Sequence, residues 1–493
     1  MSSGSERPTR VNVLQTIIEV TEYERKAMSV AWLDLCNAFG SIPHAVLKQL
    51  FESLPIPAEL RQLLIDIYSG NLLDFVIGGK SIEIAPTTGV RQGDPLSSTV
   101  FNLAAEPLLR AAKSVSTGFS LFGHSVKVTA YADDLTVIAD SAAALQETLA
   151  HVAKVAASLG LRFNPKKCAT LNFVRGKTVK VDLFIEGEQL KSLGQEDKEV
   201  YLGIPIGAKL RFRPANELLP KLDKLASSLL APWQKLEVYR SHLLPSLSHE
   251  LASGRVEKGV LATYDTECRK FLGHIAEVPI TAVTEFYYAD RSVGGLGTCR
   301  LSEDADIWTL ARASQLLTSS DPLIRNISRE QLNDTIVRGL RESVPHPLPL
   351  SEFLSGSTDG GLYRLRYANK SRTNLWMLAR RAAKRLRVRI DCSGENSCRL
   401  LADEVSTLPL KAVRGLRKVV RERNTKKFMD SKHQGRVATA LALGPKSKDM
   451  ARLISCRTEL RYEDWKYIHR ARLDILPLRG YNWSDCQDKS CRC

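Results

Sequence analysis

The sequence predicts an α+β protein of several domains, on three observations. Its 493 residues are 44% hydrophobic and 25% charged, as in an ordinary globular protein rather than a disordered, collagen-like or coiled-coil chain. At roughly 100 to 200 residues per domain, this length corresponds to about three domains. The first 210 residues alternate strand-like apolar runs with helical segments, and residues 364–448 carry arginines at helical spacing. The polar N-terminus and the lack of any run of about 18 apolar residues predict a soluble intracellular protein without membrane contact.

The first segment that carries a candidate functional group is 30–44, VAWLDLCNAFGSIPH. Its apolar start predicts a buried strand that ends at Asp34, and Pro43 predicts the opening of a helix. A single carboxylate at a strand end does not by itself predict catalysis.

A glycine-containing loop opens the next predicted helix, in residues 89–98, GVRQGDPLSS. Gly89 and Gly93 make the loop flexible, and Asp94 followed by Pro95 predicts a helix N-cap with proline at the first helical position. Such a loop lets backbone groups approach a nucleotide closely, although the isolated pattern is equally typical of a structural turn.

Residues 126–139, VKVTAYADDLTVIA, predict a β-hairpin with Asp133 and Asp134 at its tip. Adjacent carboxylates repel each other unless a cation neutralises them. With Asp34 they supply oxygen ligands of the kind that Mg²⁺ prefers, whereas a solvated acidic turn is the alternative. A helix is then predicted over 141–159, with Gly160 as its C-cap.

The order of these segments, with 99 residues from Asp34 to Asp133, resembles the palm of a reverse transcriptase. YADD, RQGDPLS and DLCNAFGSIPH are specific motifs when they occur together in this order. LRFNPKKCATL and YLGIPIG, which follow, are similar to the family's lysine-bearing loop and primer-grip hairpin. NAFGSIPH and GVRQGDPLS most resemble the non-LTR type, the site-specific LINE-like retrotransposons with a restriction-like endonuclease.

This resemblance implies nucleotidyl transfer with two Mg²⁺ ions held by Asp34, Asp133 and Asp134. We expect Asp34 and Asp133 to be the principal bridging pair, because adjacent residues near a hairpin tip cannot both point the same way. Lys167, or its neighbour Lys166, is expected to protonate the pyrophosphate leaving group, with an exposed lysine pair as the alternative.

The residues expected to bind the nucleotide or the template follow from the same resemblance. Phe39 matches the bulky side chain that lies under the sugar and favours dNTP over NTP, and an ordinary core aromatic is the alternative. The set expected to contact substrate is Phe39, Arg91, Gln92, Gly93 and Tyr131.

The architecture implied is a right-hand polymerase palm with a helical thumb and a basic helical C-terminal region. A stretch rich in Pro, Gly and Ser predicts a linker before the basic region. The expected boundaries are residual fingers at 1–28, the palm at 29–213, the thumb at 214–330, the linker at 331–363, the basic region at 364–448 and a C-terminal region at 449–493.

The formal net charge of +16 is concentrated in one part of the chain. Residues 1–363 hold 38 Lys and Arg against 41 Asp and Glu, whereas residues 364–448 hold 23 against 6. Basic amphipathic helices bind nucleic acid or acidic membranes, and a solvated helix face is the simpler alternative. We expect nucleic acid, because the excess is larger than solubility requires. The cations expected to contact it are Arg211, Arg213, Arg381, Lys384, Arg385, Arg387, Arg417 and Lys418.

Two features depart from the family pattern. Ser98 stands where the family usually has proline, and Asp34 lies so near the N-terminus that we expect a chain truncated at both ends. Cys486, Cys491 and Cys493 resemble the opening of a zinc knuckle. A tetrahedral site needs four ligands, so we expect Zn²⁺ only if a longer chain completes the knuckle.

The predicted function is RNA-directed DNA synthesis, in which element RNA is copied into DNA from a DNA primer at the target. The expected partners are the RNA template, the target DNA with its primer, and dNTPs. The family implies a nuclear location, and the sequence does not predict the oligomeric state. Two alternatives stay open: a catalytically silent nucleic-acid-binding remnant, and an RNA-dependent RNA polymerase.

Overall fold

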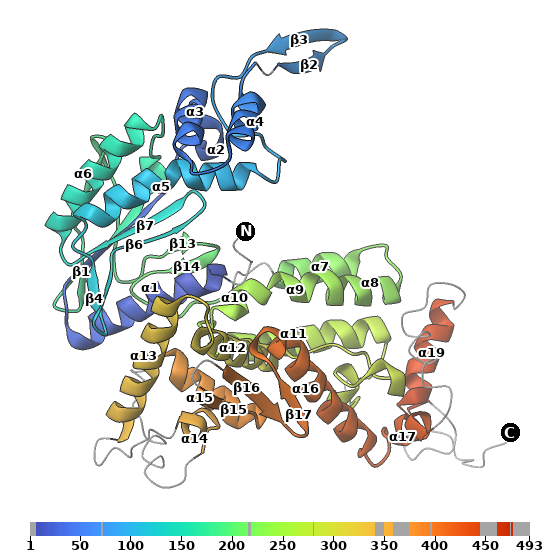
Figure 1. Ribbon diagram of the computed structural model, residues 1–493. Coiled ribbons are helices and arrows are strands. Elements are labelled where there is room, and N and C mark those ends of the chain that lie inside the picture. Colours follow the sequence, from blue (N-terminus) through green and yellow to red (C-terminus); the bar gives the residue numbers. More distant parts are fainter. Residues whose placement is uncertain are drawn as a thin grey trace, which may run out of the picture. The chain divides into compact units, whose positions relative to one another are not determined.

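The chain folds into two compact units, Met1–Leu210 and Arg211–Cys493, both of mixed helix and strand (Figure 1). This confirms the predicted α+β class. The division lies close to the expected boundary at residue 213, although the assignment of the units to palm and thumb stays a prediction. The computed structural model describes residues 6–70, 72–214, 218–279, 281–340, 350–357, 374–394, 397–443, 461–473 and 475–476.

The first unit is built on a sheet with the strand order β12-β8-β1-β7-β6, and β9 pairs with β8. β1 lies at the centre, antiparallel to both β7 and β8, and all six of its residues are buried. The sequence of a strand that is paired on both edges and covered on both faces is nearly continuously apolar, as in MSVAWL. These strands are β1 Met28–Leu33, β6 Val128–Tyr131, β7 Asp134–Ala139, β8 Ala169–Val174, β9 Lys177–Val179 and β12 Lys191–Leu193.

Helices cover both faces of the sheet (Figure 1). On one face, alternate side chains of β1 and β7 form a hydrophobic core with α5 (Ser97–Val115) and α6 (Ala142–Ser158). On the other side lies α1 (Glu6–Glu24), with Leu14, Ile17 and Ile18 fully buried.

The ends of α6 follow the prediction from the sequence. The Ser141 hydroxyl accepts a hydrogen bond from the N–H of Ala144 at 3.3 Å, which caps the first turn. Gly160, directly after the C-cap residue Leu159, has φ +74°, a conformation that favours glycine. The helix predicted over 141–159 is therefore confirmed.

α5 begins later than predicted. Leu96 is its N-cap residue, and Pro95 lies in the turn before the helix. The Asp94 carboxylate accepts from the N–H of Leu96 at 2.9 Å, while the Asp94 carbonyl accepts from the N–H of Ser97 at 3.1 Å. The predicted N-cap was therefore wrong, because Asp94 closes a turn of its own instead of capping the helix.

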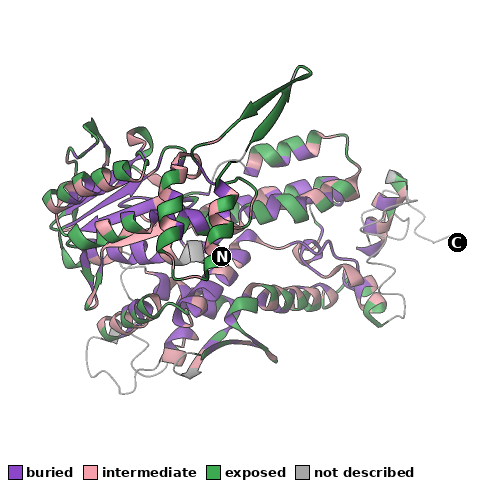
Figure 2. Ribbon diagram, turned by 45° about the horizontal axis from the view of Figure 1, so that its top comes forward, coloured by how far each residue is buried: buried purple, intermediate pink, exposed green. Residues whose placement is uncertain are grey.

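The remaining elements of the first unit are short. The β2–β3 hairpin projects from the unit, and β3 is exposed throughout (Figure 2). The helices are α2 Ala38–Ser41, α3 His44–Ser53, α4 Ala58–Tyr68 and the 3₁₀ turn Pro165–Lys167; the strands are β2 Leu73–Ile77, β3 Lys80–Ile84, β4 Phe119–Leu121, β5 His124–Val126, β10 Phe184–Ile185, β11 Glu188–Gln189, β13 Glu199–Tyr201 and β14 Ile204–Ile206.

The second unit is organised around α12 (Leu301–Leu317), most of whose residues are buried. Two hydrophobic clusters meet along this helix. None of the described helices is long and apolar enough to cross a membrane. The other helices are α7 Leu218–Ser227, α8 Pro232–Val238, α9 Leu244–Ser246, α10 Ser248–Ala252, α11 Lys258–Ala276, α13 Pro322–Leu340, α14 Leu350–Leu354, α15 Leu375–Leu386, α16 Ala412–Met429, α17 Arg436–Leu443 and α19 Tyr462–Arg472, with a π-helical turn at Tyr239–Leu243 and 3₁₀ turns at Thr284–Tyr287, Arg291–Val293 and Pro409–Lys411.

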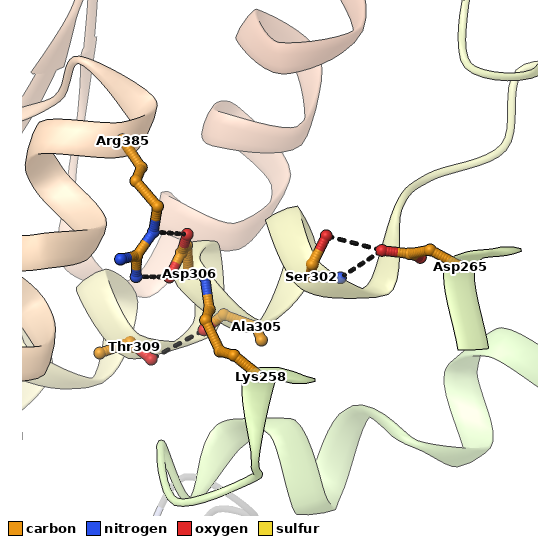
Figure 3. A network of polar contacts seen from close by, with 7 residues as sticks. All are labelled: Lys258, Asp265, Ser302, Ala305, Asp306, Thr309 and Arg385. Carbon is orange, nitrogen blue, oxygen red and sulfur yellow. Dashed lines mark hydrogen bonds and ion pairs between the residues drawn. The ribbon is translucent and has the colours of Figure 1, made fainter. Parts of the chain in front are cut away.

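Buried carboxylates tie α12 to its neighbours (Figure 3). Asp306 accepts two hydrogen bonds from the Arg385 guanidinium, at 2.8 and 2.7 Å, and lies 2.5 Å from the Lys258 ammonium. Asp265 of α11 accepts from the backbone N–H groups of Leu301 and Ser302, and so satisfies the free donors at the start of α12. These contacts fix α11 and α15 against the same helix.

Two sequence predictions fail in the second unit. The linker was expected from residue 331, but α13 continues to Leu340, and Phe353 and Leu354 of α14 are buried. The basic region was expected to be helical, but β15 Arg389–Gly394, β16 Ser397–Ala402 and β17 Val405–Thr407 form an antiparallel sheet within it. Buried alternate residues of β16, Cys398, Leu400 and Ala402, supply the apolar face that pairs with the helices.

We predict that Asp306→Ala lowers the free energy of unfolding of the second unit by about 2 to 3 kcal/mol. This lies below the roughly 3 to 5 kcal/mol of a fully buried pair, because Arg385 and Lys258 both keep some contact with water. Urea unfolding followed by circular dichroism measures the change.

Lys418→Ala is the control for this prediction. Lys418 and Glu422 form an exposed pair 3.8 Å apart on α16, which contributes about 0.5 kcal/mol or less. Equal losses in the two variants would contradict the structural role of Asp306.

Candidate active site

Asp34 directly follows β1, as the sequence predicted, and its side chain is 26% exposed. Its backbone N–H donates to Sγ of Cys168 at 3.3 Å, and its carbonyl accepts from the N–H of Asn164 at 2.8 Å. Burial raises the pKa of the Cys168 thiol to about 11, so the sulfur next to Asp34 stays uncharged. Residues 164–168, the predicted lysine-bearing loop, thus hold the peptide groups of Asp34.

The two registers of β1 decide what lies beside the Asp34 carboxylate. The β1–β7 register ends with the pair Leu33 and Leu135. Continued by one residue, it sets Asp34 opposite Asp134. Residues opposite each other in an antiparallel pair project to the same face. In the β1–β8 register, continued past the end of β1, Asp34 falls opposite Lys167, whose Nζ lies 3.7 Å from its Oδ2. Asp34 is therefore flanked by an acid on one side and a cation on the other.

Asp133 occupies the turn between β6 and β7, which confirms the predicted hairpin. Tyr131 pairs with Asp134, and the intervening Ala132 has φ +53°. The register thus makes Asp134, and not Asp133, the cross-strand neighbour of Asp34. The choice of Asp34 and Asp133 as the principal metal-binding pair stays a prediction.

The carboxylates suit a hard divalent ion in kind and in position, because all three stand where neighbouring strands end. Within the described part of the chain, no three His, Cys, Asp or Glu side chains converge closely enough to hold a metal ion. The structure thus places Asp34, Asp133 and Asp134 at one edge of the sheet, and their role as metal ligands stays a prediction.

The loop that begins at Gly89 is docked onto residues 39–44 by backbone hydrogen bonds. The N–H of Val90 donates to the Phe39 carbonyl at 2.7 Å, and the N–H of Gly89 donates to the Ile42 carbonyl at 2.8 Å. Gly89 has φ +91°, and a Cβ there would lie 2.9 Å from Cα of Gly40. Glycine at this position therefore allows two of the sequence motifs to meet.

The structure places the other expected substrate-binding residues around this junction. Phe39 stacks on Phe101, with ring centroids 4.3 Å apart, and its side chain is partly exposed. Arg91 and Gln92 are exposed in the loop, and Gly93 has φ +92°. Their roles toward substrate stay predictions.

Tyr201, in the predicted primer-grip hairpin β13–β14, reaches the catalytic hairpin. Its hydroxyl lies 3.1 Å from Oγ1 of Thr129 on β6, and burial raises its pKa above the ordinary value. The phenol therefore stays protonated and hydrogen-bonded at neutral pH. The sequence marked YLGIPIG as a hairpin but offered no signal for this contact, which depends on tertiary packing.

Several cations expected to contact nucleic acid have acidic partners inside the second unit. Arg385 binds Asp306, and Arg417 binds Asp304 of α12 through two hydrogen bonds of 2.6 and 2.7 Å. Lys418 lies near Glu422. Arginines at helical spacing therefore include fold-forming residues, which the sequence pattern could not separate from surface ones.

The other expected cations lie on exposed parts of the second unit. Lys384 and Arg387 are exposed on α15 and at its C-cap, and Arg381 is partly buried. Burial and the neighbouring Arg211 and Arg385 lower the pKa of Arg381, which shows that like charges gather here. Arg213, 3.6 Å from Glu257, has a side chain that is 74% exposed.

The predicted zinc-knuckle cysteines lie outside the described residues. The nearest described histidine upstream, His469, is buried in α19 with its ring centroid 4.1 Å from that of Trp465. Burial and Arg472 lower the pKa of His469 well below its ordinary value.

Residues 4–206 match the family described as "Reverse transcriptase (RNA-dependent DNA polymerase)". The chain is 30% identical over 314 residues to the Pol polyprotein of the R2DM retrotransposable element of Drosophila melanogaster, covering 62% of this chain and 30% of that protein. It is 26% identical over 294 residues to the R2 Pol polyprotein of Nasonia vitripennis, covering 58% and 29%.

The chain thus spans about a third of the length of these two relatives. Among solved structures, a telomerase from Candida albicans, in complex with a TWJ fragment of telomeric RNA, matches with a TM-score of 0.34 and 13% identity. That match covers 68% of this chain and 50% of the telomerase chain.

We predict that Tyr201→Phe lowers the free energy of unfolding of the first unit by about 1 kcal/mol, the ordinary contribution of one hydrogen bond. Thr129→Val removes the other partner, and the double variant closes a thermodynamic cycle. A coupling energy of about 0.5 kcal/mol or more, measured by urea unfolding, is the expected result. Strict additivity of the two losses would show that the contact contributes nothing.

Proposed function

We propose that this chain is an RNA-directed DNA polymerase, because residues 4–206 match the reverse transcriptase family and the chain is similar to the Pol polyproteins of R2 retrotransposable elements. It copies element RNA into DNA from a DNA primer at the target. The observation that carries the proposal is the position of Asp34 at the end of β1. The β1–β7 register sets Asp134 opposite it, and the β1–β8 register sets Lys167 opposite it. The alternatives, a silent binding remnant and an RNA-dependent RNA polymerase, become outcomes of the test.

Asp34, Asp133 and Asp134 are the residues that would hold two Mg²⁺ ions, which would activate the primer 3′-hydroxyl and neutralise charge on the triphosphate. The three carboxylates come from two strands and one turn of a rigid sheet, so their backbone positions are set before substrate binds. Hard oxygen ligands of this type select Mg²⁺ over softer metals.

Lys167 is proposed to move a proton to the pyrophosphate leaving group. Its ammonium lies 3.7 Å from Asp34 Oδ2, and the side chain is 67% exposed, so it faces both the acids and solvent. A general acid must be close to the group that it protonates, and the β1–β8 register supports this role because it brings Lys167 beside Asp34, a proposed metal ligand.

Phe39 is proposed to select dNTP over NTP by lying under the sugar. Its ring stacks on Phe101 of α5, which limits its freedom, while part of it stays accessible. A ring held in this way rejects an additional 2′-hydroxyl by steric exclusion. Arg91, Gln92, Gly93 and Tyr131 are proposed to contact the nucleotide and the template around it.

The exposed cations of the second unit are proposed to bind the RNA template or the target DNA. Arg211, Arg381, Lys384 and Arg387 are the members supported by their exposure or by the like charge around them. Phosphates relieve repulsion between neighbouring cations and release counterions, which makes such binding sensitive to salt. Synthesis at a chromosomal target would take place in the nucleus.

We predict that the purified chain extends a DNA primer on an RNA template with dNTPs and Mg²⁺, and that Asp133→Ala reduces the rate to background. Loss of one ligand removes the charge neutralisation on which the transfer depends. Extension is measured on sequencing gels, with equal folding of the variant checked by circular dichroism.

Asp140→Ala is the matched control, because Asp140 is an exposed acid that follows β7 at the end away from the site. Salt-sensitive RNA binding with no extension above that of Asp133→Ala would support the binding remnant. Faster incorporation of NTPs than of dNTPs would support the RNA polymerase.

We predict that the triple variant Arg381→Gln, Lys384→Gln, Arg387→Gln binds RNA more weakly than the parent chain. The slope of log affinity against log salt should fall by about 1 for each phosphate that the variant no longer neutralises. Filter binding or fluorescence anisotropy at several salt concentrations measures both effects.

The control removes three exposed lysines from the first unit, by Lys48→Gln, Lys154→Gln and Lys180→Gln. Net charge falls equally in the two triple variants. An equal change in the slopes would show that total charge, and not the α15 surface, controls binding.

A further inference from the structure

Two cysteines of the second unit face each other across neighbouring strands. Cys392 lies on β15 and Cys398 on β16, next to the Asp391–Arg399 pair of the antiparallel register. Their Sγ atoms are 2.6 Å apart, and both are free thiols. A disulfide bond measures about 2.0 Å, so these strands already hold the sulfurs close to bonding distance.

The contact between the two sulfurs makes one thiol more acidic than the other. The hydrogen bond between the two sulfurs lowers the pKa of Cys398 and raises that of Cys392. Arg329 of α13 acts on both sulfurs in favour of the thiolate, whereas Asp391 and burial oppose it. Cys398 is therefore the more acidic thiol of the pair, and Cys392 is the more exposed one.

The guanidinium of Arg329 is not fully satisfied by hydrogen bonds among the described residues. Its Nε is buried and has no hydrogen-bond partner within the described part of the chain. A guanidinium of this kind beside two thiols stabilises negative charge on sulfur, which is what distinguishes a reactive cysteine from an inert buried one.

The other buried cysteines of the unit provide a contrast. Burial raises the pKa of Cys268 to about 11 and that of Cys299 to about 12, and both are free thiols. Among the described residues, neither has a sulfur neighbour like the one that Cys392 and Cys398 give each other. They behave as small apolar core residues.

We propose that Cys392 and Cys398 form an oxidation site at which a peroxide converts two thiols into one intramolecular disulfide. The Cys398 thiolate attacks a peroxide oxygen, the O–O bond breaks, and a sulfenic acid forms with release of hydroxide. Cys392 then attacks the sulfenic sulfur, the S–S bond forms, and the hydroxyl group leaves as water after taking a proton. In sum, two thiols and one hydrogen peroxide give one disulfide and two waters.

The cross-link would join two strands of the β15–β16–β17 sheet beside the α13 and α14 helices. The Cys392 N–H lies 3.5 Å from Oγ of Ser351, next to α14, so the pair lies at the contact between the sheet and this helix. In a reducing compartment the thiols persist, and the bond reports exposure to an oxidant. This inference does not depend on the polymerase activity.

The test uses the full chain and one tryptic peptide, because residues 390–399 lie between Arg389 and Arg399 and contain both cysteines. The native protein is treated with hydrogen peroxide, denatured, alkylated with iodoacetamide and digested. We expect this peptide to lack both labels and to weigh two hydrogen atoms less than its reduced form. Dithiothreitol before alkylation should restore both labels.

The Cys268 peptide in the same digest is the internal control and should stay alkylated. In Cys398→Ser, Cys392 should stay alkylated as well, because its partner is missing. Full double labelling of residues 390–399 after peroxide, or separate oxidation of each sulfur without cross-linking, would overturn the proposal.

Discussion

The pairing of β1 with both of its neighbours is the constraint on which the candidate active site depends. β1 is short and ends at Leu33, directly before Asp34, so the residues that lie beside this acid are those that the two registers bring to the same end. A slip of one residue in either ladder would turn the opposing side chain to the other face of the sheet.

Much of this site could be predicted from the sequence, because its parts carry strong local signals. The strand before Asp34, the hairpin at Asp133 and the capped helix α6 each depend on patterns within a few residues. The cross-strand partner of Asp34 could not be predicted in this way. It depends on a register between segments about 100 residues apart, and the tip of a hairpin does not reveal which of two adjacent acids faces a third strand.

The basic region shows where local pattern fails. Arginine is a good helix former, and a helix face rich in arginine looks the same whether the charges meet solvent, phosphate or buried carboxylates. Arg417 and Arg385 bind the buried carboxylates Asp304 and Asp306 of α12, which lie more than 70 residues away in the chain. The strands within residues 389–407 were missed for a related reason, because Arg389 and Arg399, exposed on β15 and β16, continue the series of arginines from the preceding helix.

Cys168 shows how the site limits its own negative charge. Three carboxylates near one sheet edge repel each other, and a thiolate beside Asp34 would add to that repulsion. Burial keeps the thiol protonated, with a pKa of about 11, so its sulfur can accept the Asp34 N–H without adding a charge. Lys167, one residue earlier, supplies the opposite charge at 3.7 Å. Loop 164–168 thus gives Asp34 two neighbours from adjacent residues, the neutral Cys168 thiol and the positive Lys167 ammonium. The β1–β8 register brings both residues beside Asp34.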